Sequence, residues 1–358
     1  MANIAFISFY SGVVDRGVET FVHELADRLS KKHKITIFQA GSTINNPAVR
    51  TYQIISNAKI PKSTINPLAK IYLDPQSLKI LLFTTKAIPK LMRGKYDLII
   101  PLNGGWQVAI CKLLSAFMNF KIMVTGQAGI GSDDAWNLFF HPHIFIALTK
   151  AQTSWAKKLT NEVKISNIPN GVDLSKFHPK IMPKKINLPK PIIVCASALV
   201  PYKRIDLTIK AAAKANLSLL LLGDGQDHGS LDTLGKRLLK NRYLRLVVPH
   251  SEIPRYFRAG NIFSLVSKTE AFGISYIEAL ACNLPVVCTN DESRAEIIGD
   301  AGILTSPQDI DTYAKDLKIA ANTNYRNKPY NQSLKFSWNK IAELYEREIR
   351  DLTSGKNI

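Results

Sequence analysis

Two glutamates, Glu270 and Glu278, are separated by seven residues in a segment that is otherwise largely apolar. The pattern predicts a loop up to Gly273 and a helix from there to about Cys282, with Glu278 in its second turn. A carboxylate with apolar neighbours is costly unless it is paired or has a function. Glu278 can accept two hydrogen bonds from a ribose diol, as the acidic residue of dinucleotide-binding domains does. Glu270, in the loop, can accept hydrogen bonds from other sugar hydroxyls; an exposed helix glutamate is the weaker interpretation of Glu278.

The start of this predicted helix offers a second kind of contact. The N–H groups of a first helical turn have no partner within the helix. Phe272, Gly273 and Ile274 place such groups beside the loop glutamate, and glycine has no side chain to keep a ligand away. We therefore expect the backbone of these residues to bind phosphate or sugar oxygens.

Two adjacent cations, Lys203 and Arg204, follow a predicted strand over residues 192–196 and enter a predicted helix over residues 205–215. Cations at a helix start oppose the helix dipole, which favours a compensating role. A diphosphate leaving group gathers negative charge as its bond to a sugar breaks, and without a metal that charge must be offset by lysine, arginine or helix N-termini. A solvated Lys-Arg pair is the better interpretation when this segment is considered alone.

Gly17 lies in the loop between a predicted strand, residues 4–8, and a helical pattern over residues 20–29. It could bring backbone N–H groups close to an anion at the helix N-terminus. The spacing is not that of the Gly-x-Gly-x-x-Gly dinucleotide fingerprint, and an ordinary turn is an equally good interpretation.

These loops belong to two series of alternating strands and helices, which predict an α/β protein of two doubly wound, Rossmann-like domains. Ligands of such sheets bind beyond the carboxyl ends of the strands, so we expect the domains to face each other across a cleft. The predicted domains are residues 1–178 and 179–335, followed by a last helix within residues 336–358. The predicted strands are residues 4–8, 35–38, 98–101, 121–125, 144–147, 192–196, 217–222, 244–247, 262–266, 285–288 and 303–305.

The net charge of +19 is concentrated in part of the first domain, because residues 50–121 carry 11 basic and 2 acidic residues. Such an excess favours an anionic partner, although a plain basic protein is the alternative. Nucleic acid is disfavoured because few aromatic side chains are free to stack on bases. Apolar residues 80–83 and 88–92 alternate with lysines, which is typical of a helix on an anionic membrane surface and equally of a helix beside the cleft.

No apolar stretch reaches the ~20 residues that span a bilayer, and the N-terminus lacks a secretory signal, so we expect a cytoplasmic protein. The expected location extends to the inner face of the membrane if the basic surface binds it. The four cysteines are scattered in apolar contexts and predict reduced, buried thiols rather than a zinc site.

The segment around the two glutamates resembles the Glu-x7-Glu motif of the retaining family 4 glycosyltransferases, which have the GT-B fold. Five further segments resemble that family in its order: residues 17–19, 168–173, 199–206, 222–225 and 295–302. The resemblance implies a metal-independent hexosyltransferase that needs no cofactor, with the last helix packed on the first domain. Its donor would be a UDP- or GDP-linked sugar, with mannose as one candidate. Its acceptor would be a glycan or lipid-linked hydroxyl in cell-surface polysaccharide or glycolipid synthesis.

The resemblance also implies a role for each candidate residue. Lys203 and Arg204 would bind the donor diphosphate, while Glu270 would contact the transferred sugar near its reacting carbon. Glu278 would hold the ribose. The other donor-side residues are Phe272, Gly273 and Ile274 for the sugar and phosphates, Gly17 for the diphosphate, and Leu246 and His250 for the base.

The chain departs from the family pattern at two places. Ala198 stands where many members have an arginine, so one phosphate cation is missing. Gln127 stands where many members have a histidine, and glutamine cannot take a proton near neutral pH. Gln127 and two residues of the same region, Asp133 and Asp134, are candidate acceptor contacts.

Two other functions remain open. A sugar-nucleotide epimerase of similar shape would need acid and base groups that the sequence does not identify. A catalytically silent nucleotide-sugar-binding protein would have the same donor residues and would release no nucleoside diphosphate.

Overall fold

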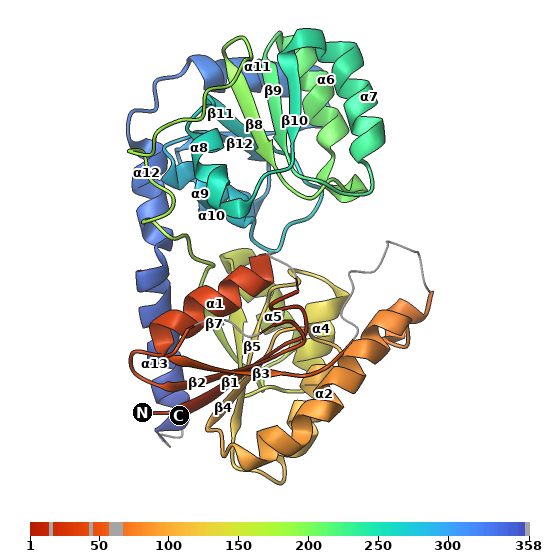
Figure 1. Ribbon diagram of the computed structural model, residues 1–358, viewed down its shortest axis with the longest axis vertical. Coiled ribbons are helices and arrows are strands. Elements are labelled where there is room, and N and C mark those ends of the chain that lie inside the picture. The colour runs from red at the N-terminus through yellow and green to blue at the C-terminus, as the bar shows by residue number, and fades with distance from the viewer. Residues whose placement is uncertain (14–16, 43–45, 57–66, 355–358) are drawn as a thin grey trace. The chain divides into compact units, whose positions relative to one another are not determined.

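The computed structural model describes residues 1–13, 17–42, 46–56 and 67–354. The chain divides into two compact units, Met1–Asn170 together with Trp338–Ile358, and Gly171–Ser337. Each unit is built on one parallel sheet with helices packed against it, as Figure 1 shows. The predicted class of two doubly wound α/β domains is confirmed.

The first unit has a seven-stranded sheet in the order β3-β2-β1-β4-β5-β6-β7. Its central strands are short apolar runs that are buried along their whole length, as expected for a sheet covered on both faces. The strands are β1 Asn3–Ser8, β2 Lys34–Gln39, β3 Val49–Gln53, β4 Leu98–Pro101, β5 Lys121–Thr125, β6 Ile144–Ala147 and β7 Lys164–Asn167.

Two apolar clusters hold helices against the opposite faces of this sheet. One cluster joins α1 and α13 to the sheet through residues such as Phe21 and Tyr345. The other joins α2, α3, α4 and α5 through residues such as Phe83, Cys111 and Leu138. The helices are α1 Gly17–Leu29, α2 Pro75–Arg93, α3 Trp106–Ser115, α4 Ser132–Phe139, α5 Lys150–Leu159 and α13 Trp338–Thr353, with a 3-10 turn η1 at Pro67–Ile71.

The last helix, α13, is bound to the first unit by aromatic packing and one buried hydrogen bond. The ring of Phe21 lies 5.9 Å from that of Trp338 and 5.7 Å from that of Tyr345. His33 Nδ1 accepts the backbone N–H of Ala2, so Nε2 carries the proton and donates it to Glu346 at 2.5 Å. The Ser166 hydroxyl also donates to the carboxylate of Glu348 on α13, 182 positions further along the chain.

The second unit has a six-stranded sheet in the order β10-β9-β8-β11-β12-β13. The strand order reverses between β8 and β11, so the loops that follow these two strands diverge from a common edge. The strands are β8 Ile192–Ala196, β9 Ser218–Leu222, β10 Tyr243–Leu246, β11 Ile262–Leu265, β12 Val286–Thr289 and β13 Gly302–Thr305.

The helices of the second unit form two groups, with α6, α7 and α11 in contact on one side and α8, α9, α10 and α12 on the other. A buried hydroxyl network joins the first group to the sheet, because the Tyr313 hydroxyl bonds Ser264 at 2.6 Å and Thr208 at 3.1 Å. The helices are α6 Ile205–Ala215, α7 His228–Leu239, α8 Ile253–Phe257, α9 Ile274–Ala281, α10 Glu292–Ile298, α11 Ile310–Asn322 and α12 Lys328–Ser333. The 3-10 turns are η2 Pro201–Lys203, η3 Lys240–Arg242, η4 His250–Glu252 and η5 Leu334–Phe336.

All four cysteines are unbridged and buried, as the sequence predicted. Burial raises the pKa of Cys111 and of Cys195 to about 12. These thiols are therefore protonated and unreactive near neutral pH.

Candidate functional site

The candidate residues of the second unit gather at the carboxyl ends of β8 and β11, where the strand order of the sheet reverses. Ligands of open parallel sheets bind at such a switch point. Lys203 and Arg204 belong to the segment that follows β8, and Glu270 belongs to the loop that follows β11. The sheet topology therefore brings together residues that lie 67 positions apart in the sequence.

Lys203 and Glu270 form an ion pair at this edge. Lys203 Nζ donates to Glu270 Oε1 at 2.6 Å, and both side chains are 13% exposed. The hydroxyl of Ser267 donates to the same carboxylate oxygen at 2.7 Å. The loop glutamate is thus held by a cation and a hydroxyl, with a second carboxylate oxygen left to accept other hydrogen bonds.

Arg204 is directed into the protein rather than along the loop surface. Its backbone is left-handed, with φ of 52°, and its Nε donates to Val266 O at 2.7 Å. Its Nη2 donates to Ser267 O and to Thr289 Oγ1, each at 3.0 Å. Burial, with a smaller contribution from a neighbouring guanidinium, lowers the pKa of Arg204.

Glu278 and His250, both predicted from the sequence, lie together. Glu278 is on α9 and its side chain is 9% exposed, whereas His250 begins η4 after β10 and is 47% exposed. His250 Nε2 and Glu278 Oε1 are 2.9 Å apart. Leu246 ends β10 just ahead of this turn, and the ring of Phe177 lies 5.6 Å from the imidazole.

The residues predicted to bind a ligand through their backbone, Phe272, Gly273 and Ile274, lie between the two glutamates in the sequence. Gly273 precedes α9 with φ of 90°, and a Cβ there would lie 2.4 Å from the ring of Tyr276, which is fully buried. Only glycine fits this position without strain. Phe272 is buried against Phe336, so it can meet a ligand only through its backbone. Ile274 is the first residue of α9.

Two residues in contact with this loop, Thr289 and Arg294, were not predicted. The carbonyl oxygen of Ser267 accepts hydrogen bonds from Arg204, from Arg294 at 2.9 Å and from Thr289 at 3.1 Å. Arg294 is on α10 and only 3% exposed. The available signal in the sequence was a basic residue three and four positions before the apolar residues Ile297 and Ile298.

The candidate acceptor residues of the first unit surround the loop between β5 and α4. The side-chain amides of Gln127 and Asn170 exchange two hydrogen bonds, at 3.0 and 3.1 Å. Asp133 is exposed at the start of α4 and accepts a hydrogen bond from the Tyr72 hydroxyl at 2.8 Å. Gly17 begins α1, while residues 14–16 of the same predicted loop lie outside the described ranges.

Asp134 is buried, in contrast to its neighbour, and its hydrogen bonds fix the β5–α4 loop from within. It accepts hydrogen bonds from the N–H of Gly129 at 3.0 Å, from Asn137 at 3.1 Å and from Gln152 at 3.0 Å. Gln152 also donates to the carbonyl of Gly126. Asp134 is 1% exposed, so it supports the loop and does not contact an acceptor directly.

We expect the ionisation of Asp134 to lower stability as the pH rises. Burial raises the pKa of this carboxyl to about 7, above the unfolded value near ~4. Between these values the folded chain keeps a proton that the unfolded chain releases, so the stabilisation is complete below pH ~4 and is lost through pH 7. Relative to Asp134→Asn, the free energy of unfolding of the wild type should fall by roughly 2–4 kcal/mol between pH 4 and 8.

Urea unfolding at several pH values measures this difference. The substitution can be accommodated because Asn137 Oδ1 is buried without a hydrogen-bond partner among the described residues, and rotation of the Asn137 amide would let this oxygen accept from the introduced amide. Asp133→Asn, at the exposed neighbouring position, is the control. Parallel pH profiles for the wild type and Asp134→Asn would contradict the assignment.

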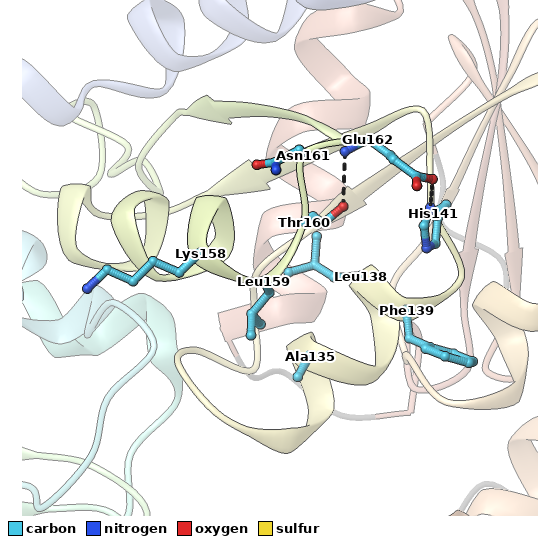
Figure 2. Close-up of a pocket in the computed structure, with 9 residues that line it drawn as sticks. All are labelled: Ala135, Leu138, Phe139, His141, Lys158, Leu159, Thr160, Asn161 and Glu162. Carbon is cyan, nitrogen blue, oxygen red and sulfur yellow. Dashed lines mark hydrogen bonds and ion pairs between the residues drawn. The ribbon is translucent and has the colours of Figure 1, made fainter.

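A surface depression of about 440 Å³ lies elsewhere in the first unit, beside α4 and α5. Figure 2 shows Leu138 and Phe139 on one side and the ion pair of His141 and Glu162, 2.5 Å apart, at one end. None of the predicted site residues lines it. Within the described ranges, no group of three or more histidine, cysteine, aspartate or glutamate side chains is arranged to hold a metal ion.

Residues 178–335 match the family model described as Glycosyl transferases group 1. The second unit belongs to this family. Both glutamates of the motif, together with Lys203, Arg204 and His250, lie within the matched part of this group 1 glycosyltransferase unit.

Curated relatives extend the similarity beyond this unit. The chain is 25% identical over 259 residues, 65% of its length, to a subunit of the phosphatidylinositol N-acetylglucosaminyltransferase of Arabidopsis thaliana. It is 29% identical over 166 residues, 40% of its length, to the GDP-mannose-dependent monoacylated alpha-(1-6)-phosphatidylinositol monomannoside mannosyltransferase of Corynebacterium glutamicum. These matches cover 58% and 44% of the two relatives, so the chain spans about half their length.

Similarity to a solved structure covers almost the whole chain. HepE of Anabaena, in complex with UDP and glucose, superimposes with a TM-score of 0.74 at 16% identity, over 98% of this chain and 100% of that one. At this identity the likeness concerns the fold. The GT-B fold expected from the sequence is confirmed for this chain.

Proposed function

We propose that this protein is a retaining hexosyltransferase of family 4, which transfers a hexose from a nucleotide-diphosphate sugar to a hydroxyl of a glycan or lipid-linked acceptor. The observation that carries the proposal is the pair of contacts Lys203–Glu270 and His250–Glu278, at the ligand-binding edge of a group 1 glycosyltransferase unit. The two contacts involve a cation, two carboxylates and an imidazole, and Gly273 lies between the two glutamates in the sequence, directly before α9. Diphosphate, sugar hydroxyls and ribose are the chemical groups that such a set binds.

Each side chain of these two pairs would bind a different part of the donor. Glu278 accepts hydrogen bonds from the ribose diol, beside His250. Lys203 offsets the charge that develops on the diphosphate when the bond between the anomeric carbon and the phosphate oxygen breaks. Glu270 accepts hydrogen bonds from hydroxyls of the transferred sugar, through the oxygen that Lys203 and Ser267 do not occupy. No step of this proposal requires a metal or an organic cofactor.

Two features of the relatives support the choice of substrates. The Corynebacterium relative is named for GDP-mannose and HepE was solved with UDP and glucose, which supports a UDP- or GDP-linked hexose, with mannose as the first candidate. Both curated relatives are named for phosphatidylinositol-based acceptors, which supports a lipid-linked acceptor in glycolipid or cell-surface polysaccharide synthesis.

The test is a screen of thermal stability with UDP, GDP, ADP and their sugars. A ligand that binds only the folded state raises the midpoint temperature of unfolding. At 100 times its Kd, such a ligand adds about 2.7 kcal/mol to the free energy of unfolding. UDP or GDP should raise it and ADP should not. No shift with any nucleotide would overturn the proposal, whereas a shift without release of nucleoside diphosphate would favour the silent binder.

We further propose that the outer surface of α2 to α5 binds an anionic membrane surface, at the inner face of the cytoplasmic membrane. Apolar side chains are exposed along α2, with Leu78 at 40%, Leu82 at 58% and Met92 at 52%. The same helix carries four basic residues and no acidic one, and it continues through Pro89. Further exposed apolar residues on α3, α4 and α5 are Leu113, Phe139 and Leu159.

This combination is typical of a helix layer that lies in a lipid interface, with apolar side chains among the acyl chains and lysines at the headgroups. A lipid-linked acceptor would then be within reach of a protein that stays at the surface. No helix in the described part of the chain is long and apolar enough to cross a membrane.

Replacing Lys86 and Lys90 by glutamine should weaken binding to vesicles that contain phosphatidylserine or phosphatidylglycerol by about 30-fold. Each lysine near an anionic surface contributes about 1 kcal/mol, and 1.4 kcal/mol corresponds to a tenfold change. Leu78→Ser/Leu82→Ser should weaken it as well, whereas Ile319→Ser, at an exposed apolar residue of the second unit, should not. Sedimentation with vesicles measures the effect, and equal binding by all variants would refute the membrane surface.

A further inference from the structure

The carbonyl oxygen of Ser267 is the acceptor of an unusual number of strong donors. Arg294 Nη2 lies 2.9 Å from it, Arg204 Nη2 lies 3.0 Å from it, and the Thr289 hydroxyl donates at 3.1 Å. The three donors come from α10, the turn after β8 and the end of β12. One peptide group of the β11–α9 loop is therefore fixed by three separate elements.

This arrangement costs free energy, and such strained or repulsive arrangements persist only where the surrounding structure holds them in place, which is common at functional sites. Two guanidinium groups converge on one neutral oxygen, and like charges at close range repel. Arg294 is only 3% exposed, and its ionic partner Asp291 is 39% exposed. Arg204 adopts the left-handed backbone conformation, with φ of 52°, which non-glycine residues rarely adopt.

Arg294 also fixes the helical side of the loop. Its Nε donates to the Tyr276 hydroxyl at 3.2 Å, and that hydroxyl donates to the carbonyl of Leu265 at 3.0 Å. Tyr276 lies directly beneath Gly273, where a Cβ would contact its ring. The loop is therefore held near both of its ends by hydrogen bonds that involve one buried arginine.

The fixed peptide determines where Glu270 lies. The Ser267 hydroxyl donates to Glu270 Oε1 at 2.7 Å, so the residue whose carbonyl is clamped also holds the carboxylate. The other donor to that oxygen, Lys203, immediately precedes Arg204 in the chain. Arg204 and Arg294 thus set the position of both donors to Glu270 and of the carboxylate itself.

We propose that Arg204 and Arg294 are positioning residues that hold Glu270 and Lys203 at the donor sugar, and that Arg204 is not a ligand of the diphosphate. The role of Glu270 toward the sugar rests on the proposed function. The assignment departs from the sequence-based expectation because Nε and Nη2 of Arg204 are already bonded to Val266, Ser267 and Thr289. Of the two adjacent cations, Lys203 alone would then bind the phosphates of the donor.

The test compares Arg204→Gly and Arg294→Gln with the wild type. Glycine suits the backbone conformation at position 204, so this variant removes the guanidinium without new backbone strain. Lys210→Gln is the control, because Lys210 is a cation of the same turn-and-helix segment that pairs with Asp206 and is 44% exposed. Thr289→Val and Arg294→Lys are the substitutes if Arg294→Gln does not fold.

Three measurements separate the possible roles: hydrogen exchange of residues 266–273 without ligand, the Kd for UDP and GDP, and kcat for release of nucleoside diphosphate from UDP-glucose and GDP-mannose. We expect exchange of the loop to speed up at least about tenfold, the Kd to change less than about threefold, and kcat to fall about 100-fold, as small misplacements of reacting groups do. Lys210→Gln should match the wild type in all three.

Two results would overturn the proposal. Unchanged loop exchange in both arginine variants would show that the clamp does not order the loop. A tenfold or larger rise in the Kd of Arg204→Gly, with unchanged exchange, would place Arg204 on the diphosphate. If the wild type bound neither nucleotide, the proposed function would fail, while the exchange measurement would still decide whether the arginines position the loop.

Discussion

Glu278→Ala is expected to weaken the binding of nucleoside diphosphate by about 100-fold or more. The carboxylate would lose two hydrogen bonds to the ribose diol, and hydrogen bonds to charged groups contribute about 1.5–3 kcal/mol each. Because Glu278 is 9% exposed and pairs with His250, its site is already formed in the absence of ligand. Titration calorimetry with UDP and GDP measures the loss.

The partner histidine provides the matched comparison for this variant. His250→Gln keeps the carboxylate and a hydrogen-bond donor beside it, so its Kd should rise by less than about tenfold. The apolar neighbours of Glu278 on α9 are buried, and alanine preserves the helix. If folded Glu278→Ala bound nucleoside diphosphate with the Kd of the wild type, Glu278 would not be the residue that binds the ribose.

Lys203→Met and Glu270→Gln are each expected to lower kcat by about 100- to 1000-fold. Loss of the cation removes the offset for the leaving diphosphate, an effect of the size found when one preorganised donor to a developing charge is removed. Loss of the carboxylate removes a contact to the transferred sugar. The measurement is the initial rate of nucleoside diphosphate release under saturating donor.

A comparison of stability and kcat in single and double variants shows whether the Lys203–Glu270 ion pair acts in catalysis or only stabilises the loop. Both side chains are 13% exposed, so each single variant leaves a largely buried group without its partner and should lower the free energy of unfolding by roughly 2–3 kcal/mol. The double variant should recover most of that loss, because no unpaired charge remains, while its kcat stays low. Recovery of kcat together with stability would show that the pair only holds the loop.

Much of the fold was predictable from apolar periodicity. Every predicted strand is present, and five of them, residues 98–101, 121–125, 144–147, 192–196 and the start of 262–266, match the observed bounds at their first residue. These strands are buried along all or nearly all of their length, so each contains a continuous apolar run. The two strands that were not predicted, β3 and β7, are the edges of the first sheet.

The edge strands were missed for a physical reason. β3 reads Val-Arg-Thr-Tyr-Gln and only its first residue is buried, while β7 reads Lys-Ile-Ser-Asn and has no buried residue. An edge strand is paired on one side only and needs little apolar surface. Its sequence therefore resembles a loop, and its place in the sheet follows from pairing that a single sequence does not reveal.

In the candidate site too, features that depend on neighbouring residues could be predicted, whereas features that depend on contacts between distant residues could not. Glu270, Glu278 and Gly273 could be found because an acidic residue in an apolar helix and a glycine before a helix are local signals. The inward direction of Arg204 could not be found, because its acceptors lie 62 to 85 positions away in the sequence. The burial of Asp134 depends in the same way on Gln152, in another helix.

The most direct test of the central claim is the release of nucleoside diphosphate from UDP- and GDP-linked hexoses, measured side by side for the wild type and Lys203→Met/Glu270→Gln. We expect release by the wild type with at least one donor and a fall of about 100-fold or more in the double variant, with both proteins folded. Equal rates for the two proteins, or no release from any donor by the wild type, would contradict it.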